Sequence, residues 1–126
     1  MKYISILTII LLNSAFGLTQ RAEFNFINGP VHEFEKTHEG IQLKHYFVFE
    51  NTGEEPLIID KALVSCECTK VYLPEKPVLP QQKDSILVTF DTKDKYYQQD
   101  RVIKLISNTR KKQKLRFRVY VIPEED

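Results

Sequence analysis

The residues with the clearest capacity for chemistry are the two cysteines, Cys66 and Cys68, which are separated by one residue. In an extended backbone, alternate side chains point to the same face. The Cα atoms of such a pair would lie about 6.6–7.2 Å apart. Disulfides favour a separation of about 5.5–6 Å and rarely exceed 6.8 Å, so a bond within this pair requires a kink in the backbone. A disulfide formed in this way would be strained and easily reduced.

Four interpretations of the cysteine pair stay open. The pair can be structural, either buried or disulfide-bonded, or it can be a labile redox pair. It can bind a soft metal such as Cu(I), which thiolates select, or it can link two protein chains. Zinc needs four ligands, and adding the distant His32, His38 and His45 to the two cysteines does not give a convincing set. We therefore predict no zinc site and assign no cofactor, while copper binding by the cysteine pair stays open.

Charge is distributed unevenly along the chain. Residues 18–60 hold eight acidic and three basic residues, whereas residues 101–118 hold eight basic residues and no acidic one. Acidic and basic strands can pair their charges side by side, and basic residues on a terminal strand can prevent edge-to-edge aggregation. The alternative is a basic face that binds an anionic glycan, a lipid headgroup or nucleic acid. Of these partners, nucleic acid is the least expected for an exported protein. The candidates for an anionic partner are Arg110, Lys111, Lys112, Lys114, Arg116 and Arg118.

Two further features are candidates for contacts rather than for catalysis. Tyr96 and Tyr97 lie in a polar segment, where aromatic side chains can serve as interface anchors or pack back onto the rim of the domain. His45 lies on the apolar face of an alternating segment, which favours a partly buried structural histidine. No phosphate-binding loop, nucleophile elbow or zinc-protease motif is present, so we predict no catalytic residues and no enzyme.

The first 17 residues have the layout of a secretory signal peptide. A basic residue near the start precedes the uncharged apolar run at residues 4–12, and Ala15 and Gly17 supply small residues before a possible cleavage site. The run is about half of the roughly 20 residues that a membrane span requires. We therefore expect cleavage near Gly17, a single domain over residues 18–126 with no stable membrane insertion, and a periplasmic or secreted location.

Alternating apolar residues and turn residues predict strands throughout the mature chain. In the clearest segment, Ile41, Leu43, Phe47 and Phe49 share one face, and Tyr46 and Val48 lie on the other. Alternation in the last segment predicts four inward residues, Leu115, Phe117, Val119 and Val121. Three prolines within residues 74–80 exclude a central strand and suggest a crossing between two sheets. About seven short strands in some 100 residues favour an all-β immunoglobulin-like sandwich, with a small β-barrel as the alternative. The expected strands cover 21–28, 31–35, 41–50, 57–65, 84–91, 101–107 and 113–121, with polar loops at 92–100 and 108–112. The segment 31–35 is either a separate short strand or the continuation of the first strand after a kink.

The segment from Tyr46 to Thr69 resembles a known bacterial family. Its pattern is F-x-F-x-N-T-G-x-x-P-L-x-I followed by S-C-x-C-T, then a proline-rich crossing, a V-x-F-D strand and Ser107-Asn108. This order is similar to that of the domain-of-unknown-function 1573 family of envelope proteins, over roughly residues 40–121. The chain departs from the family pattern at Glu67, where glycine is usual, at Gln81 after Pro80, and at residues 96–98. The resemblance implies an immunoglobulin-like fold and an envelope location, and it supplies no catalytic residues.

These features together favour a non-enzymatic binding or structural module of the bacterial envelope. Such a module would contact another envelope protein through a sheet edge or a loop end. The alternative is a periplasmic thiol protein that uses Cys66 and Cys68 for redox exchange or copper binding.

Overall fold

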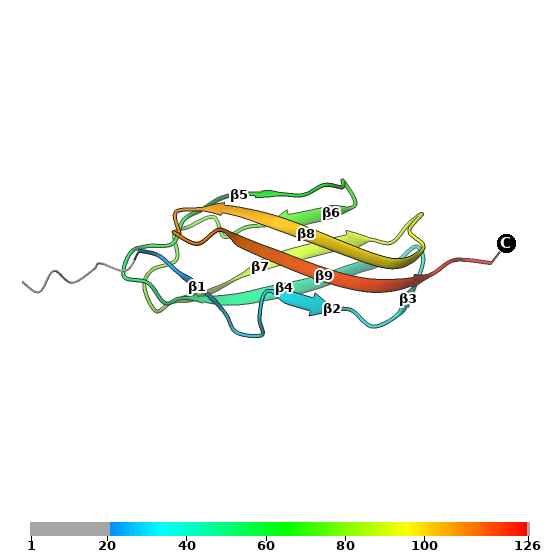
Figure 1. Cartoon of the computed structure of the whole chain (residues 1–126), viewed down its shortest axis with the longest axis horizontal. Coiled ribbons are helices and arrows are strands. Elements are labelled where there is room, and N and C mark those ends of the chain that lie inside the picture. The colour runs from blue at the N-terminus through cyan, green and yellow to red at the C-terminus, as the bar shows by residue number, and fades with distance from the viewer. Residues whose placement is uncertain (1–20, 126) are drawn as a thin grey trace, which may run out of the picture.

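The computed structural model describes residues 21–125 and shows two β-sheets packed face to face (Figure 1). The predicted signal peptide and its cleavage site lie outside the described residues. Two facing sheets confirm the predicted sandwich. The strands of the described part are β1 (Phe24–Phe26), β2 (Val31–Glu33), β3 (Thr37–His38), β4 (Gln42–Asn51), β5 (Ile59–Leu63), β6 (Thr69–Tyr72), β7 (Lys83–Asp91), β8 (Tyr97–Ser107) and β9 (Gln113–Ile122).

One sheet has four strands in the order β1-β4-β7-β6, and all of its pairs are antiparallel. The other has the order β2-β9-β8-β5, and β3 also pairs with β9. Because β2 and β3 run parallel to β9 and cover its free side, the last strand lies inside its sheet. The expectation that basic residues on this strand protect a sheet edge is therefore wrong. The true edges are short: β1, β6 and β5, and the pair β2 and β3.

The core lies between the sheets and comes from the alternating strands. On β4, Phe47 and Phe49 are buried while Tyr46 and Val48 point outward, as the alternation predicts. Ile41 was expected on the inner face, but it precedes β4 and is 43% exposed. The last strand contributes four buried side chains, Leu115, Phe117, Val119 and Val121, all on the predicted face.

Several strand boundaries predicted from the sequence differ from those in the structure. The strand expected at 57–65 is shortened to β5, with an irregular register between Ile59 and Lys61. Leu57 instead forms an isolated bridge with Val78, within the proline-rich crossing. The loop expected at 92–100 ends early, because β8 begins at Tyr97. Two strands, β3 and β6, were not predicted at all.

A buried asparagine joins three segments at one end of the sandwich. The Asn51 side-chain amide donates hydrogen bonds to the carbonyls of Glu55 (2.7 Å) and Val78 (2.9 Å). Its Oδ1 accepts from the backbone N–H groups of Glu23 (3.2 Å) and Gly53 (3.0 Å). This asparagine therefore ties the start of the domain and the proline-rich crossing to the end of β4.

Candidate functional site

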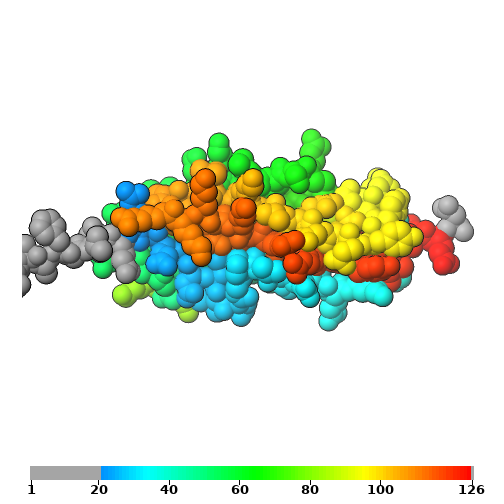
Figure 2. Space-filling model, in the orientation of Figure 1, coloured from blue at the N-terminus to red at the C-terminus, as the bar shows by residue number. Residues whose placement is uncertain are grey.

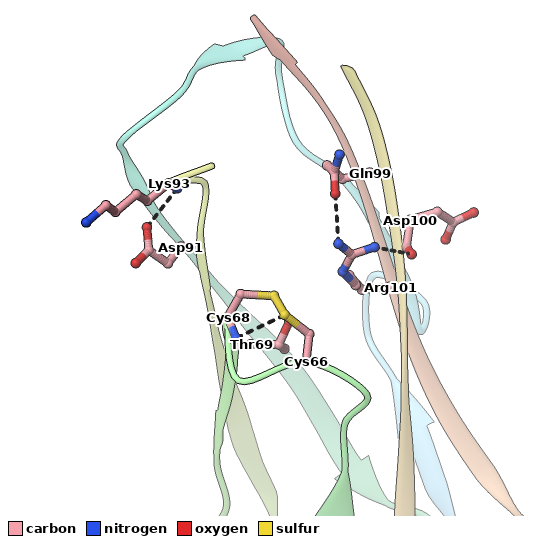
Figure 3. Close-up of a disulfide and its surroundings, with 8 residues drawn as sticks. All are labelled: Cys66, Cys68, Thr69, Asp91, Lys93, Gln99, Asp100 and Arg101. Atoms are coloured by element: carbon pink, nitrogen blue, oxygen red, sulfur yellow. Dashed lines mark hydrogen bonds between the residues drawn. A yellow bond between two sulfur atoms is a disulfide. The ribbon is translucent and has the colours of Figure 1, made fainter. Parts of the chain in front are cut away.

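Cys66 and Cys68 form a disulfide inside one tight turn, between β5 and β6 (Figure 3). Their Cα atoms are 5.1 Å apart, so the backbone is kinked here, as a bond between these residues requires. The turn is closed by a hydrogen bond from the N–H of Thr69 to the carbonyl of Cys66 (3.2 Å). A second bond, from the N–H of Asp91 to the carbonyl of Cys68 (2.9 Å), attaches the turn to the end of β7.

Each sulfur already has a hydrogen-bond donor close to it. The backbone N–H of Cys68 donates to Cys66 Sγ at 3.1 Å (Figure 3). The hydroxyl of Thr69 lies 3.9 Å from Cys68 Sγ, and it is the donor because a disulfide sulfur carries no hydrogen. Both donors are therefore in position for the thiolates that reduction of the disulfide would create.

A groove of about 590 Å³ lies beside Cys68 on the outer face of the four-stranded sheet. Its lining is polar and carries both charges, and it includes Gln42, Thr69, Lys70, Thr89 and Asp91. The carboxylate of Asp91 also accepts a hydrogen bond from the N–H of Lys93 (2.9 Å), which fixes its orientation. Cys68 lines this groove, whereas Cys66 does not, and the Cys68 side chain also packs against the core, so the groove lies on the Cys68 side of a partly buried disulfide.

A row of two exposed tyrosines with a half-buried leucine between them crosses the same sheet next to the groove. Tyr46 on β4 and Tyr72 on β6 both pair with Leu87 on β7, so the three residues are direct neighbours across three strands. The two tyrosines are 58% and 53% exposed. We call these three residues the tyrosine row. In the adjacent register, Lys44 and Lys70 flank Thr89 in the same way and place two cations beside the row. The sequence predicted that Tyr46 faces outward, but it could not align Tyr46 with Tyr72.

The predicted basic cluster separates into two parts. Arg116 forms a two-pronged ion pair with Asp100 on β8 (2.7 and 2.8 Å), and Arg118 contacts both Asp100 and Glu33. The hydrogen bond from Arg116 is the main cause that lowers the pKa of the Asp100 carboxyl. For these two arginines, the structure therefore shows pairing with acidic residues on neighbouring strands.

Three of the remaining cations lie in the β8–β9 turn, and the fourth, Lys114, lies at the start of β9. Within residues 21–125, Arg110, Lys111, Lys112 and Lys114 form no ion pair. Two shallow grooves of about 320 and 500 Å³ flank this turn. Figure 2 shows the corresponding orange segment toward the left end of the described residues. The structure thus leaves these four residues as the accessible part of the predicted anionic-partner set.

The two loop tyrosines have different positions. Tyr97 is the first residue of β8, with φ 62°, and its exposed ring packs edge-on against Tyr120. Tyr96 stays in the short loop, where its carbonyl accepts a hydrogen bond from the side-chain amide of Gln99 (2.7 Å). Their placement in one polar loop is therefore only half correct, and they lie away from the tyrosine row.

His45 has a partner that the sequence did not reveal. Its ring stacks on that of His32 with centroids 3.6 Å apart and planes 8° apart. Burial lowers the pKa of His32, and burial followed by repulsion from His32 lowers the pKa of His45. No group of three or more potential metal-binding side chains occurs within residues 21–125. The pair is thus partly buried, as predicted for His45 alone.

Comparison with known proteins assigns the chain first to a class of folds and then to a family. An immunoglobulin-like sandwich of this kind resembles the PapD-like domain 7 of human CEP192, with 13% identity, a TM-score of 0.54, and coverage of 86% of this chain and 88% of that one. It also resembles the YadV chaperone, with 10% identity, a TM-score of 0.50, and coverage of 82% and 52%. The model of the family "Protein of unknown function (DUF1573)" matches residues 24–121, and the chain belongs to this family.

A protein of unknown function from Porphyromonas gingivalis W83 has a similar structure, with 12% identity and a TM-score of 0.71. The match covers 84% of this chain and 50% of that protein, so the present chain corresponds to about half of its relative. No curated protein shows significant sequence similarity. At these identities the structural likenesses establish the fold alone. Within residues 21–125, no helix is long and apolar enough to span a membrane.

Proposed function

We propose that this chain is a non-enzymatic binding module of the bacterial envelope that recognises another protein through the outer face of its four-stranded sheet. The observation that carries this proposal is the tyrosine row. Exposed apolar surface that is contiguous and bordered by polar residues marks interaction sites. Tyrosine is enriched among the residues that dominate binding energy, because it offers a large apolar ring and a polar hydroxyl at low entropic cost.

The sheet edges support the same choice of surface. Addition of a partner strand needs a run of unpaired backbone groups. The edge strands β1, β6 and β5 have only three, four and five residues, and β5 is interrupted by a register shift. Short and irregular edges are the usual means by which sandwiches avoid strand addition. These short edges therefore favour the sheet face as the contact surface.

Export to the envelope is part of this proposal. It rests on the apolar run at residues 4–12 and on the disulfide, since disulfides persist in oxidising compartments. A processed N-terminus near Leu18 in protein recovered from the periplasm or the medium would support export. An unprocessed chain in the cytosol would contradict it.

Site-specific photocrosslinking in intact cells tests the binding surface. A photoreactive residue at position 87, in the centre of the tyrosine row, should give a discrete and reproducible adduct with another protein. The same residue at position 102 is the matched control, because Val102 is an exposed residue at the centre of the opposite outer face. We expect Tyr46→Ser with Tyr72→Ser to abolish the adduct, and Tyr97→Ser to leave it unchanged. Equal labelling from positions 87 and 102 would contradict the proposal, and loss of the adduct only in Tyr97→Ser would move the contact to the start of β8.

A further inference from the structure

We propose that the Cys66–Cys68 disulfide exchanges with a thiol of the protein that docks on the tyrosine row, with Cys68 as the sulfur under attack. This inference rests on the proposed function, since it names the partner as a protein with two reactive cysteines. One disulfide exchanges with one partner molecule. The exchange therefore adds a covalent step to binding and does not require a catalytic cycle.

A purely stabilising role gives a weak account of this disulfide. Disulfides stabilise mainly by restricting the unfolded chain, and the effect grows with the length of the loop that they close. Here the sequence separation is two, the turn is already closed by the backbone hydrogen bond from Thr69, and a second bond from Asp91 attaches it to β7. The bond joins no distant elements, so a chemical role accounts for it better.

The position of the groove determines which sulfur is attacked. Cys68 lines the groove on the outer face, next to Lys70 and Thr89. Thr89 and Lys70 are register partners, and the tyrosine row is the next outward-facing register of the same strands. A partner held by the tyrosine row therefore reaches Cys68 before it reaches Cys66.

The hydrogen bonds favour the same direction of attack. Displacement at Cys68 Sγ expels Cys66 Sγ, and the N–H of Cys68 at 3.1 Å stabilises the thiolate that leaves. A better stabilised leaving thiolate makes exchange faster.

The reaction balances with the partner as the only co-reactant. A partner thiolate attacks Cys68 Sγ, the bond between Cys66 and Cys68 breaks, and its electron pair leaves on Cys66 Sγ. A second partner thiolate then attacks the partner sulfur of the mixed disulfide and releases Cys68 as a thiolate. The partner is oxidised by two electrons to a disulfide, and Cys66 and Cys68 take up the two protons that the partner thiols lose. The reverse reaction with a protein disulfide restores the starting state.

The edge strand β6 gives the partner segment a means of alignment. It begins at Thr69, immediately after Cys68, and pairs only with β7, so the backbone groups of its other side can bond an extended segment. Four residues are too few for a stable added strand, but they can orient a cysteine that the tyrosine row already holds nearby.

The first experiment uses glutathione as a small thiol that needs no docking surface. The folded mature chain is incubated with reduced glutathione and quenched with N-ethylmaleimide, and the adducts are located by peptide mass. We expect glutathione on Cys68 and the maleimide on Cys66. Glutathione on Cys66, or no reaction until the protein is denatured, would overturn the inference.

The second experiment traps the partner in cells. Cys66→Ser leaves Cys68 as a thiol that can attack a partner disulfide without being resolved, so we expect a protein adduct that a reductant releases. Cys68→Ser is the matched control and should give none. Equal trapping by both variants, or by neither, would contradict the assignment of Cys68. If the photocrosslink fails while glutathione still reacts at Cys68, the docking proposal alone is wrong, and the opposite pattern rejects the exchange alone.

Discussion

The rings of His32 and His45 stack in parallel across the two sheets, with centroids 3.6 Å apart. His32 comes from β2 of one sheet and His45 from β4 of the other, and Phe34 and Phe47 pack edge-on against this pair. Two parallel imidazoles in contact cannot both carry a proton without repulsion. Burial lowers the pKa of both rings, so the folded sandwich favours their neutral forms.

This stack makes the stability of the domain depend on pH. Both folded-state pKa values are lowered from 6.5, by burial in each case and by mutual repulsion for His45. Below pH 6.5 the unfolded chain therefore binds more protons than the folded one, and the free energy of unfolding falls as the pH falls through that value. We expect the urea midpoint to be lower at pH 5.5 than at pH 8. Replacing both histidines by glutamine should reduce this difference. His38→Gln, at an exposed position outside the stack, should preserve the difference, and a difference that survives in the double variant would contradict the assignment.

The hydrogen bonds of Asn51 predict a large effect of a small change. Asn51→Ala removes four hydrogen bonds at a side chain with no exposed surface and leaves buried backbone groups without partners. We expect a loss of about 3 kcal/mol in the free energy of unfolding, measured in urea. Asn25→Ala, at an exposed position on β1, is the control and should change it by less than about 0.5 kcal/mol. Similar losses in the two variants would show that the Asn51 contacts contribute little.

Alanine substitutions at Gly53 and Gly29 compare the cost of a steric clash with the cost of backbone strain. A Cβ at Gly53 would coincide with the backbone carbonyl of Arg21, whereas a Cβ at Gly29 would have no neighbour within 4 Å. Gly29 has φ 78°, so alanine there costs only conformational strain of about 1–2 kcal/mol. We expect Gly53→Ala to cost more, about 2–3 kcal/mol, and to release the chain near Arg21. Urea unfolding together with proteolysis after Arg21 measures both effects, and a smaller cost at Gly53 than at Gly29 would be inconsistent with the close approach.

Prediction from the sequence was most accurate for strands whose inner and outer residues alternate regularly. Alternation alone identified the inner residues of β4 and β9, because each side chain is assigned to a face by its immediate neighbours. It failed for β6, whose four residues lie between the cysteine turn and three prolines. It also failed for Ile41, which continues the alternation but lies beyond the end of the strand.

Features that depend on pairing between strands could not be predicted. The tyrosine row requires the register of β4 and β6 on β7, and the contact of Arg116 with Asp100 requires that of β9 on β8. The His32 stack depends on a parallel pairing of β2 with β9 that connects distant parts of the chain. The cysteine geometry was half predictable: spacing required a kink, but the bond from Asp91 that fixes the turn comes from a strand more than 20 residues away.

The division of the basic cluster predicts that equal losses of charge have unequal effects. Arg110→Gln with Lys112→Gln removes two cations that have no acidic partner in the described residues, whereas Arg116→Gln with Arg118→Gln removes two that are paired with Asp100 and Glu33. A cation that already faces a carboxylate contributes less to the field that an external anion meets. We expect the first variant to elute from immobilised heparin at clearly lower salt than the wild-type chain, and the second to elute close to it. Because both variants lose the same net charge, equal shifts would mean that the whole strand, and not the β8–β9 turn, forms the anionic surface contact.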